Sequence, residues 1–142
     1  MGAEQVRGRL RRLMKTTEFS LNGQTYHLCL NGAALFDIYE KYGSKGFVTD
    51  HVKGNGKKSF EATCWILAKL AEQGELVRRY LGHDRGPIPS EGLLRAMLSP
   101  RDVPEAKAAI TEAVRRGFER EKKEDGPVDL GLLELEKKAK AP

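Results

Sequence analysis

The stretch Gly54-Asn55-Gly56-Lys57-Lys58-Ser59 has the glycines, the lysine and the hydroxyl group of a loop that could hold a phosphate. A complete phosphate-binding loop has a glycine five positions before its Gly-Lys pair, where this chain has His51. It also has Ser or Thr directly after the lysine, where this chain has Lys58, and it follows a β-strand, for which the preceding residues give no sign. The pattern therefore predicts a flexible basic loop and not a nucleotide site.

The histidines and cysteines do not form a recognisable metal motif. His27, His51 and His83 lie in separate segments, and the chain has no Cys-x-x-Cys or His-x-x-x-His pair. His27 and Cys29 share one face of a predicted strand and could begin a zinc site, but the sequence does not supply the remaining ligands. Cys64 stands in an apolar segment, which is typical of a core residue and not of a nucleophile. We predict structural roles for these residues and no metal.

Paired carboxylates can act as acid and base when burial separates their pKa values. Asp37 and Glu40 are three positions apart in one predicted helix, and Glu61 opens another. Each falls on a charged face, which is typical of solvated helix surface. No combination of residues for hydrolysis, phosphoryl transfer or hydride transfer emerges. We therefore expect a protein without enzymatic activity and without a cofactor.

The elements that carry these residues come from a chain of 142 residues, 39% hydrophobic and 32% charged, which suits one domain with a modest core. No apolar run approaches the ~20 residues of a membrane span. Arg11 and Arg12 interrupt the N-terminus too early for a secretory signal. Two cysteines are too few for a disulfide framework and suit a reducing cytoplasm. These features argue against secreted, membrane-spanning and disordered classes.

Most of the net charge of +5 lies at the N-terminus. Residues 1–15 form a basic arm with one acid, Glu4, and five cationic side chains, Arg7, Arg9, Arg11, Arg12 and Lys15. One interpretation is an arm that binds the phosphate backbone of a nucleic acid. The other is that residues 1–13 are not native, because the run from Met14 to Phe19 is typical of a bacterial start and the preceding Arg and Gly codons resemble a ribosome-binding sequence.

Alternating apolar residues flank Asn22-Gly23 between residues 17 and 30. Asn-Gly is the strongest short signal for a two-residue hairpin turn, because both turn positions need a positive φ. Such a turn pairs Phe19 with Tyr26 and Leu21 with Gln24, which places the apolar side chains on one face. A lone hairpin is marginal in water, so we expect this face to rest on helices.

Apolar stripes and capping residues predict helices after the hairpin. Asn31 caps a helix over residues 32–42, and a polar loop follows over residues 44–58. Ser59 caps a central helix that is apolar nearly all round and therefore buried. We expect Gly74 to end or bend this helix before a further turn or two.

The second half of the chain contains two more predicted helices. After a rigid connector, Gly86-Pro87-Ile88-Pro89, Ser90 caps a short helix. Ser99 caps a long helix with Pro100 in its first turn and a charged, exposed end that reaches Lys123. One stripe of this helix faces the core and consists of Ala106, Ile110, Ala113, Val114 and Phe118.

These elements predict an α+β, mainly α fold, with an N-terminal β-hairpin followed by a small bundle of four to five helices. Residues 16–123 form a single domain, and residues 124–142 form a linker and a leucine-bearing C-terminal tail. The short helix and the tail hold more apolar residues than their length requires, which favours docking to a partner or completion of the core. The candidate partner-binding residues are Leu93, Leu94, Met97, Leu98, Leu130, Leu132, Leu133 and Leu135.

The order of these features resembles the small tail assembly chaperones of long-tailed phages and prophages. The resemblance rests on the run from Thr16 to Leu28, TTEFSLNGQTYHL, and on the helix from Leu35 to Gly43, LFDIYEKYG. The apolar helix around Trp65 and the late helix to Phe118 fit in order and size. Together these segments cover most of residues 16–123.

The resemblance implies a protein that is not an enzyme and that binds the tape measure protein, a very long helical chain. It implies that the protein keeps this client soluble and brings tail tube protein to it in the cytoplasm of the bacterial host, and that it is absent from the mature virion. Chaperones that coat a client commonly self-associate, so a homo-oligomer fits the family. The family has no catalytic or ligand motif to carry over.

Two other functions remain open. A small nucleic-acid-binding regulator of a phage or mobile element would use the basic arm, but the predicted helices present no convincing recognition face. A structural component of the virion, such as a head–tail adaptor, would be present in purified particles. We expect neither nucleic-acid binding nor a membrane location for the chaperone.

Overall fold

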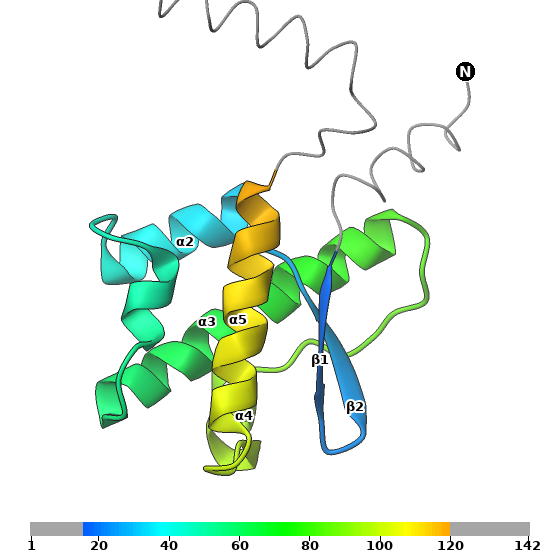
Figure 1. Cartoon of the computed structure of the whole chain (residues 1–142). Helices are drawn as coiled ribbons and strands as arrows, with labels where there is room; N and C mark the ends of the chain where they lie inside the picture. The colour runs from blue at the N-terminus through cyan, green and yellow to red at the C-terminus, as the bar shows by residue number, and fades with distance from the viewer. Residues whose placement is uncertain (1–15, 120–142) are drawn as a thin grey trace, which may run out of the picture.

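The computed structural model describes residues 16–119, which form a two-stranded antiparallel hairpin followed by helices (Figure 1). This is the predicted α+β, mainly α architecture. In chain order the elements are β1 (Thr17–Leu21), β2 (Gln24–Leu28), α2 (Gly32–Tyr42), the 3-10 helix η1 (Val48–Val52), α3 (Lys57–Tyr80), α4 (Glu91–Met97) and α5 (Val103–Phe118).

The hairpin has the predicted turn and register. Asn22 and Gly23 adopt φ values of 50° and 81°, as a turn of this type requires, and Phe19 pairs with Tyr26. The apolar side chains of one face, Phe19, Leu21, Tyr26 and Leu28, are buried, whereas the residues of the other face are exposed or half-buried. The buried face therefore packs on the helices, as the alternation predicts.

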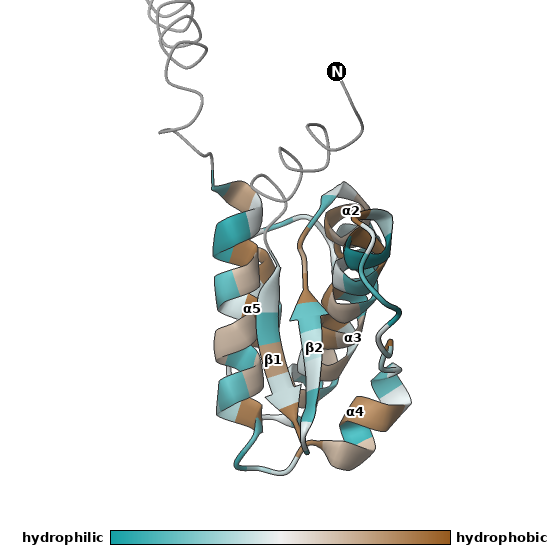
Figure 2. Ribbon diagram, turned by 90° about the vertical axis from the view of Figure 1, so that its right-hand side faces the viewer, coloured by the Kyte–Doolittle hydropathy of each residue, from teal (hydrophilic) through white to brown (hydrophobic). Residues whose placement is uncertain are grey.

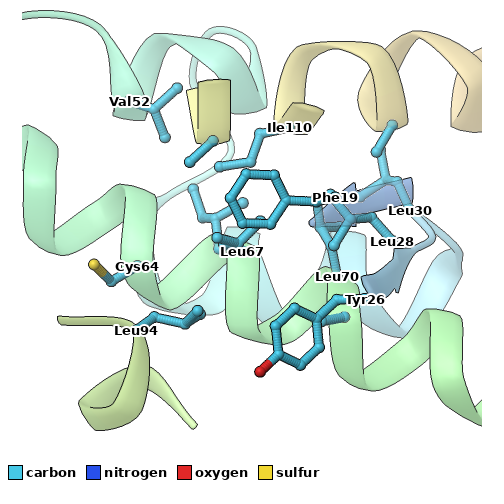
Figure 3. Close-up of a cluster of buried hydrophobic side chains, with 14 of the residues drawn as sticks. Phe19, Tyr26, Leu28, Leu30, Val52, Cys64, Leu67, Leu70, Leu94 and Ile110 are labelled. Atoms are coloured by element: carbon cyan, nitrogen blue, oxygen red, sulfur yellow. The ribbon is translucent and has the colours of Figure 1, made fainter. Parts of the chain in front are cut away.

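Helix α3 is the centre of the fold, because it contacts β2, α2, η1, α4 and α5. Figure 2 shows the hairpin beside α5, with β1 next to α5 and β2 next to α3. Figure 3 shows how hairpin residues such as Phe19 and Tyr26 gather with Leu67 and Leu70 of α3 and Ile110 of α5. A single apolar cluster thus joins the hairpin to both long helices.

Helix α3 begins three residues earlier than predicted, at Lys57, with Gly56 and not Ser59 as its N-cap. Ser59 is not the cap, because its hydroxyl points back and donates hydrogen bonds to the carbonyl oxygens of Val52 (2.8 Å) and Gly54 (3.0 Å). The preceding loop is also more ordered than predicted, since it contains η1. Ser59 thus holds the end of η1 against the first turn of α3.

The prediction that Gly74 ends the central helix is wrong, because α3 continues without a break to Tyr80. The absent side chain instead makes room for the hairpin. A Cβ atom at Gly74 would lie 1.8 Å from the carbonyl oxygen of His27. Cys29, the first residue after β2, donates its backbone N–H to the carbonyl oxygen of Leu70 at 3.0 Å, so the chain at the end of β2 crosses α3 in direct backbone contact.

The other helix ends agree with the sequence to different degrees. Asn31 and Ser90 cap α2 and α4 as predicted. Helix α5 begins at Val103, later than predicted, because a turn over residues 99–102 precedes it. In this turn the backbone N–H and the hydroxyl group of Ser99 donate hydrogen bonds of 3.0 and 2.9 Å to the Asp102 carboxylate. It ends at Phe118, whose ring is 61% exposed, so the prediction that Phe118 completes the core stripe is wrong.

Candidate protein-binding surfaces

Helix α4 divides its apolar residues between the core and the surface. Leu94 is fully buried and Leu98, just beyond the helix, is 6% exposed, whereas Leu93 and Met97 are each 43% exposed. The prediction that all four belong to a surface is therefore wrong for Leu94 and Leu98. Leu93 and Met97 are four positions apart and lie on the same side of the helix. We call these two side chains the α4 face.

The segment that leads into α4 is fixed to α3 by a buried carboxylate that the sequence analysis missed. Glu75 is 2% exposed and accepts hydrogen bonds from the backbone N–H of Gly86 (2.6 Å), from Arg78 (2.6 Å) and from Arg79 (2.8 Å). Arg79 also donates to the carbonyl oxygen of Gly86 at 3.0 Å. The spacing of one glutamate three and four positions before two arginines was the available signal.

The charges around Glu75 decide its protonation. Burial by itself would raise the pKa of this carboxyl group, but the Gly86 N–H and the two guanidinium groups stabilise the ionised form. Their combined effect is larger, so the pKa lies below its ordinary value. An ionised Glu75 therefore holds the connector to α3 at neutral pH, and the connector in turn delivers the chain to Ser90 at the start of α4.

A second apolar surface lies between the N-terminal ends of α3 and α5, in a cleft of about 590 Å³. We call this cleft the α3–α5 groove. Its apolar lining consists of Phe60, Leu98, Pro100, Val103 and Pro104. Asn55, Gly56 and Lys107 provide the polar part of the lining. The sequence analysis did not predict this surface, because its walls come from two segments that are distant along the chain, residues 55–60 and 98–107.

Lys107 contacts the loop that the sequence analysis considered as a phosphate site. Its ammonium group donates to the carbonyl oxygen of Gly54 at 2.6 Å and lies 3.0 Å from the Ser59 hydroxyl. A lysine of α5 thus ties the glycine-containing loop to the start of α3. The polar groups of this loop serve the packing of α5 on α3.

A half-buried aromatic cluster covers another side of α3. The Tyr42 ring stacks on the His51 ring, with the ring centroids 5.3 Å apart. It also packs edge-on against the Trp65 ring, with the centroids 5.7 Å apart. The Nζ atoms of Lys41 and Lys69 lie 5.3 and 5.8 Å from the centroid of the Trp65 ring. These contacts hold η1 and α2 against α3, so Trp65 lies at the edge of the core as part of the packing.

Burial sets the properties of the residues considered for catalysis or metal binding. Burial lowers the pKa of the half-buried His27, whereas it raises the pKa of the Cys29 thiol, which packs with Val77 and Leu81. Cys64 is fully buried, as predicted, and burial raises its pKa to about 11. Within residues 16–119 no group of three or more His, Cys, Asp or Glu side chains is placed to hold a metal ion.

The three carboxylates considered for acid–base chemistry are exposed or paired with basic side chains. Asp37 pairs with Lys69 at 3.0 Å, and Glu40 is exposed. Glu61 lies 3.9 Å from Lys57 and 3.6 Å from Arg95 of α4. These are surface ion pairs, which contribute little to stability and do not create a reactive group.

The remaining candidate residues lie outside the part of the chain that the structure describes. They are Arg7, Arg9, Arg11, Arg12 and Lys15 of the arm and Leu130, Leu132, Leu133 and Leu135 of the tail. In the described part, no helix is long and apolar enough to span a bilayer.

Comparison with known proteins does not add to this description: no protein-family model, curated protein or solved structure matches the chain. The α4 face and the α3–α5 groove are therefore the structural basis on which a function can be proposed.

Proposed function

We propose that this chain is a non-enzymatic tail assembly chaperone of a long-tailed phage or prophage. It binds the tape measure protein, keeps that long helical chain soluble and helps to bring tail tube subunits to it. It acts in the cytoplasm of the bacterial host and is absent from the mature virion. The sequence support is the resemblance of the hairpin and the following helices to that family.

The structural observation that supports the proposal best is the α4 face. Leu93 and Met97 stay exposed on a helix that Leu94 anchors in the core, and the charged Arg95 lies between them in sequence. An apolar pair bordered by charge suits weak binding to the apolar stripe of a client helix, and a methionine side chain adapts to different partners. Many such contacts along a long client add up through multivalency. Self-association of copies would extend the same surface.

The test begins with the DNA that flanks the gene. A very long downstream gene for a helical protein, together with a slippery sequence and an overlapping frame near the stop codon, identifies the client and a frameshifted longer form. The client is then co-expressed with the full-length chain, and its soluble fraction is measured. We expect the wild-type chain to keep the client soluble and the double variant Leu93→Ser/Met97→Ser to lose most of this effect.

Ala96→Ser is the matched control, because Ala96 is an exposed position on the same helix. It should act as the wild-type chain does. A wild-type chain that leaves the client insoluble overturns the chaperone proposal, as do neighbouring genes for regulators or repair enzymes. A fully active double variant removes the α4 face from it, and the protein in purified particles would favour a structural component of the virion.

A further inference from the structure

The α3–α5 groove has the properties of a site for an apolar segment that carries acidic residues. Five of its lining residues are apolar, and Lys107 lies in its wall. Lys57 and Lys58 follow the lining residue Gly56 in the first turn of α3. Three acids are close along the chain: Glu61 pairs with Lys57 and Arg95, Asp102 accepts hydrogen bonds from Ser99, and Glu105 in the first turn of α5 is exposed.

The start of α3 adds to this preference for an acidic occupant. Gly56 provides no side-chain hydrogen bond as N-cap, and the first turn of α3 has no acidic residue. The N–H groups at the start of a helix and the positive end of its dipole stabilise a nearby carboxylate. Asn55 and Gly56, which border this helix start, line the groove.

The chain itself contains a segment with the complementary composition. Residues 128–135, VDLGLLEL, which we call the leucine segment, hold Leu130, Leu132, Leu133 and Leu135. The wider stretch 124–136 has five acidic side chains and no lysine or arginine. The leucine segment thus offers apolar side chains for the walls of the groove and carboxylates for its basic rim.

We propose that the leucine segment of each chain docks in the α3–α5 groove of the same chain. Its leucine side chains contact Phe60, Val103 and Pro104, and its carboxylates face Lys107 and the start of α3. Because segment and groove share one chain, their effective concentration is high and a modest intrinsic affinity suffices. The proposal does not depend on the chaperone function, since no client takes part.

The length of the chain permits this contact. The fourteen positions from Pro104 to Phe118 correspond to about 21 Å of helix rise, which the tail must retrace to reach the groove. The ten residues 119–128 span up to about 33 Å when extended. The leucine segment therefore begins within reach of the groove, even though α5 ends at the opposite side of the molecule (Figure 1).

Paramagnetic relaxation on the full-length chain tests the proposal. A nitroxide is attached at Glu134→Cys, within the leucine segment. The native thiols of Cys29 and Cys64 are buried and have raised pKa values, so the label reacts at position 134. We expect the methyl signals of Leu98 and Val103 to lose most of their intensity when the label is oxidised, while those of Val77, in a separate cluster, keep theirs.

A matched variant, Leu132→Ser/Leu133→Ser in the same labelled chain, should restore the groove signals, because it removes the apolar contacts without touching residues 16–119. Groove signals that stay unaffected in the parent labelled chain overturn the proposal, and so does broadening near Thr17 at the N-terminal end of the domain. Broadening in a mixture of isotope-labelled chains and separate spin-labelled chains also overturns it, because the occupant would then be the tail of a second copy.

Discussion

Two neighbouring residues of α3, Gly74 and Glu75, make contacts with distant segments that their residue types do not suggest. Gly74 lies where the backbone of β2 crosses α3, and Glu75, its neighbour, anchors the connector to α4. A glycine inside a helix usually weakens it, and a glutamate usually faces solvent. Here the close approach of β2 accounts for the glycine, and the connector at Gly86 accounts for the buried glutamate.

Gly74→Ala should destabilise the domain by about 3 kcal/mol or more, because its methyl group would overlap the His27 carbonyl oxygen and the backbone would have to move. Gly92→Ala in α4 is the matched control. Its methyl group meets nothing closer than the Ser90 hydroxyl at 3.9 Å, so it should stabilise by about 0.5 kcal/mol. Urea unfolding measures both changes. Equal changes in the free energy of unfolding for the two variants would mean that β2 does not cross α3 in contact with Gly74.

Glu75→Gln should lower the free energy of unfolding by about 1–3 kcal/mol, because two arginines lose a buried, hydrogen-bonded partner. Glu112→Gln is the control, since Glu112 also joins two arginines but lies on the exposed side of α5, and it should cost much less. Chemical denaturation at neutral pH compares them. A similar loss in both variants would contradict the anchoring role of Glu75.

The same carboxyl group gives the stability a defined pH dependence. The pKa of Glu75 is lower in the folded chain than its ordinary value of 4.5, so the unfolded chain binds the proton more readily. This contribution is complete above pH 4.5 and is lost as the pH falls through the folded pKa. The stability difference between wild type and Glu75→Gln should therefore shrink in acid. A difference that stays constant across this range would exclude the ionised form as its cause.

At the scale of elements, α4 shows how a helix that is too short to be stable alone gains a fixed position. Ser90 caps its first turn, Leu94 anchors its middle, and the Glu75 contacts fix the connector before it. Seven residues are too few to form a stable helix alone, so these tertiary contacts decide that it forms. The same anchoring leaves the side chains of Leu93 and Met97 exposed to solvent.

Leu94→Ala should destabilise the domain by about 2–5 kcal/mol, because it opens a cavity at a fully buried position. Leu93→Ala, on the same helix but 43% exposed, should change the free energy of unfolding little. Thermal or urea unfolding of the two variants measures the difference. A large loss for Leu93→Ala would mean that its side chain is covered in solution, and the α4 face would not be available to a client.

At the scale of the whole molecule, the charge is distributed unevenly between the domain and the basic arm. Residues 16–119 hold nearly equal numbers of basic and acidic side chains, whereas residues 1–15 hold most of the net positive charge. The domain places the chain entering β1 beside the end of α5, where Arg116 donates to the Thr16 carbonyl oxygen at 2.9 Å. Residues 16–119 thus begin and end at the same end of the domain, away from α4 (Figure 1).

This distribution predicts that the domain has no appreciable affinity for nucleic acid. Any binding of the full-length chain to a DNA duplex should fall steeply with salt and disappear when residues 1–13 are deleted, because the arm alone would supply the phosphate contacts. Fluorescence anisotropy at several salt concentrations measures this. Tight binding that persists after the deletion would favour the nucleic-acid-binding regulator over the chaperone.

The sequence by itself determined the local features. The hairpin turn and register, the caps at Asn31 and Ser90 and the burial of Cys64 follow from short-range backbone preferences and apolar patterning, which act wherever the chain lies. The tertiary structure decided what depends on contacts between distant segments. It determined why Gly74 is a glycine, why Glu75 is buried, which leucines of α4 stay exposed, and how Phe60, Leu98 and Val103 meet in one groove. Those outcomes depend on how α3 packs against its neighbours. The spacing of Glu75 before two arginines indicates ion pairs, but local spacing does not determine which segment then covers them.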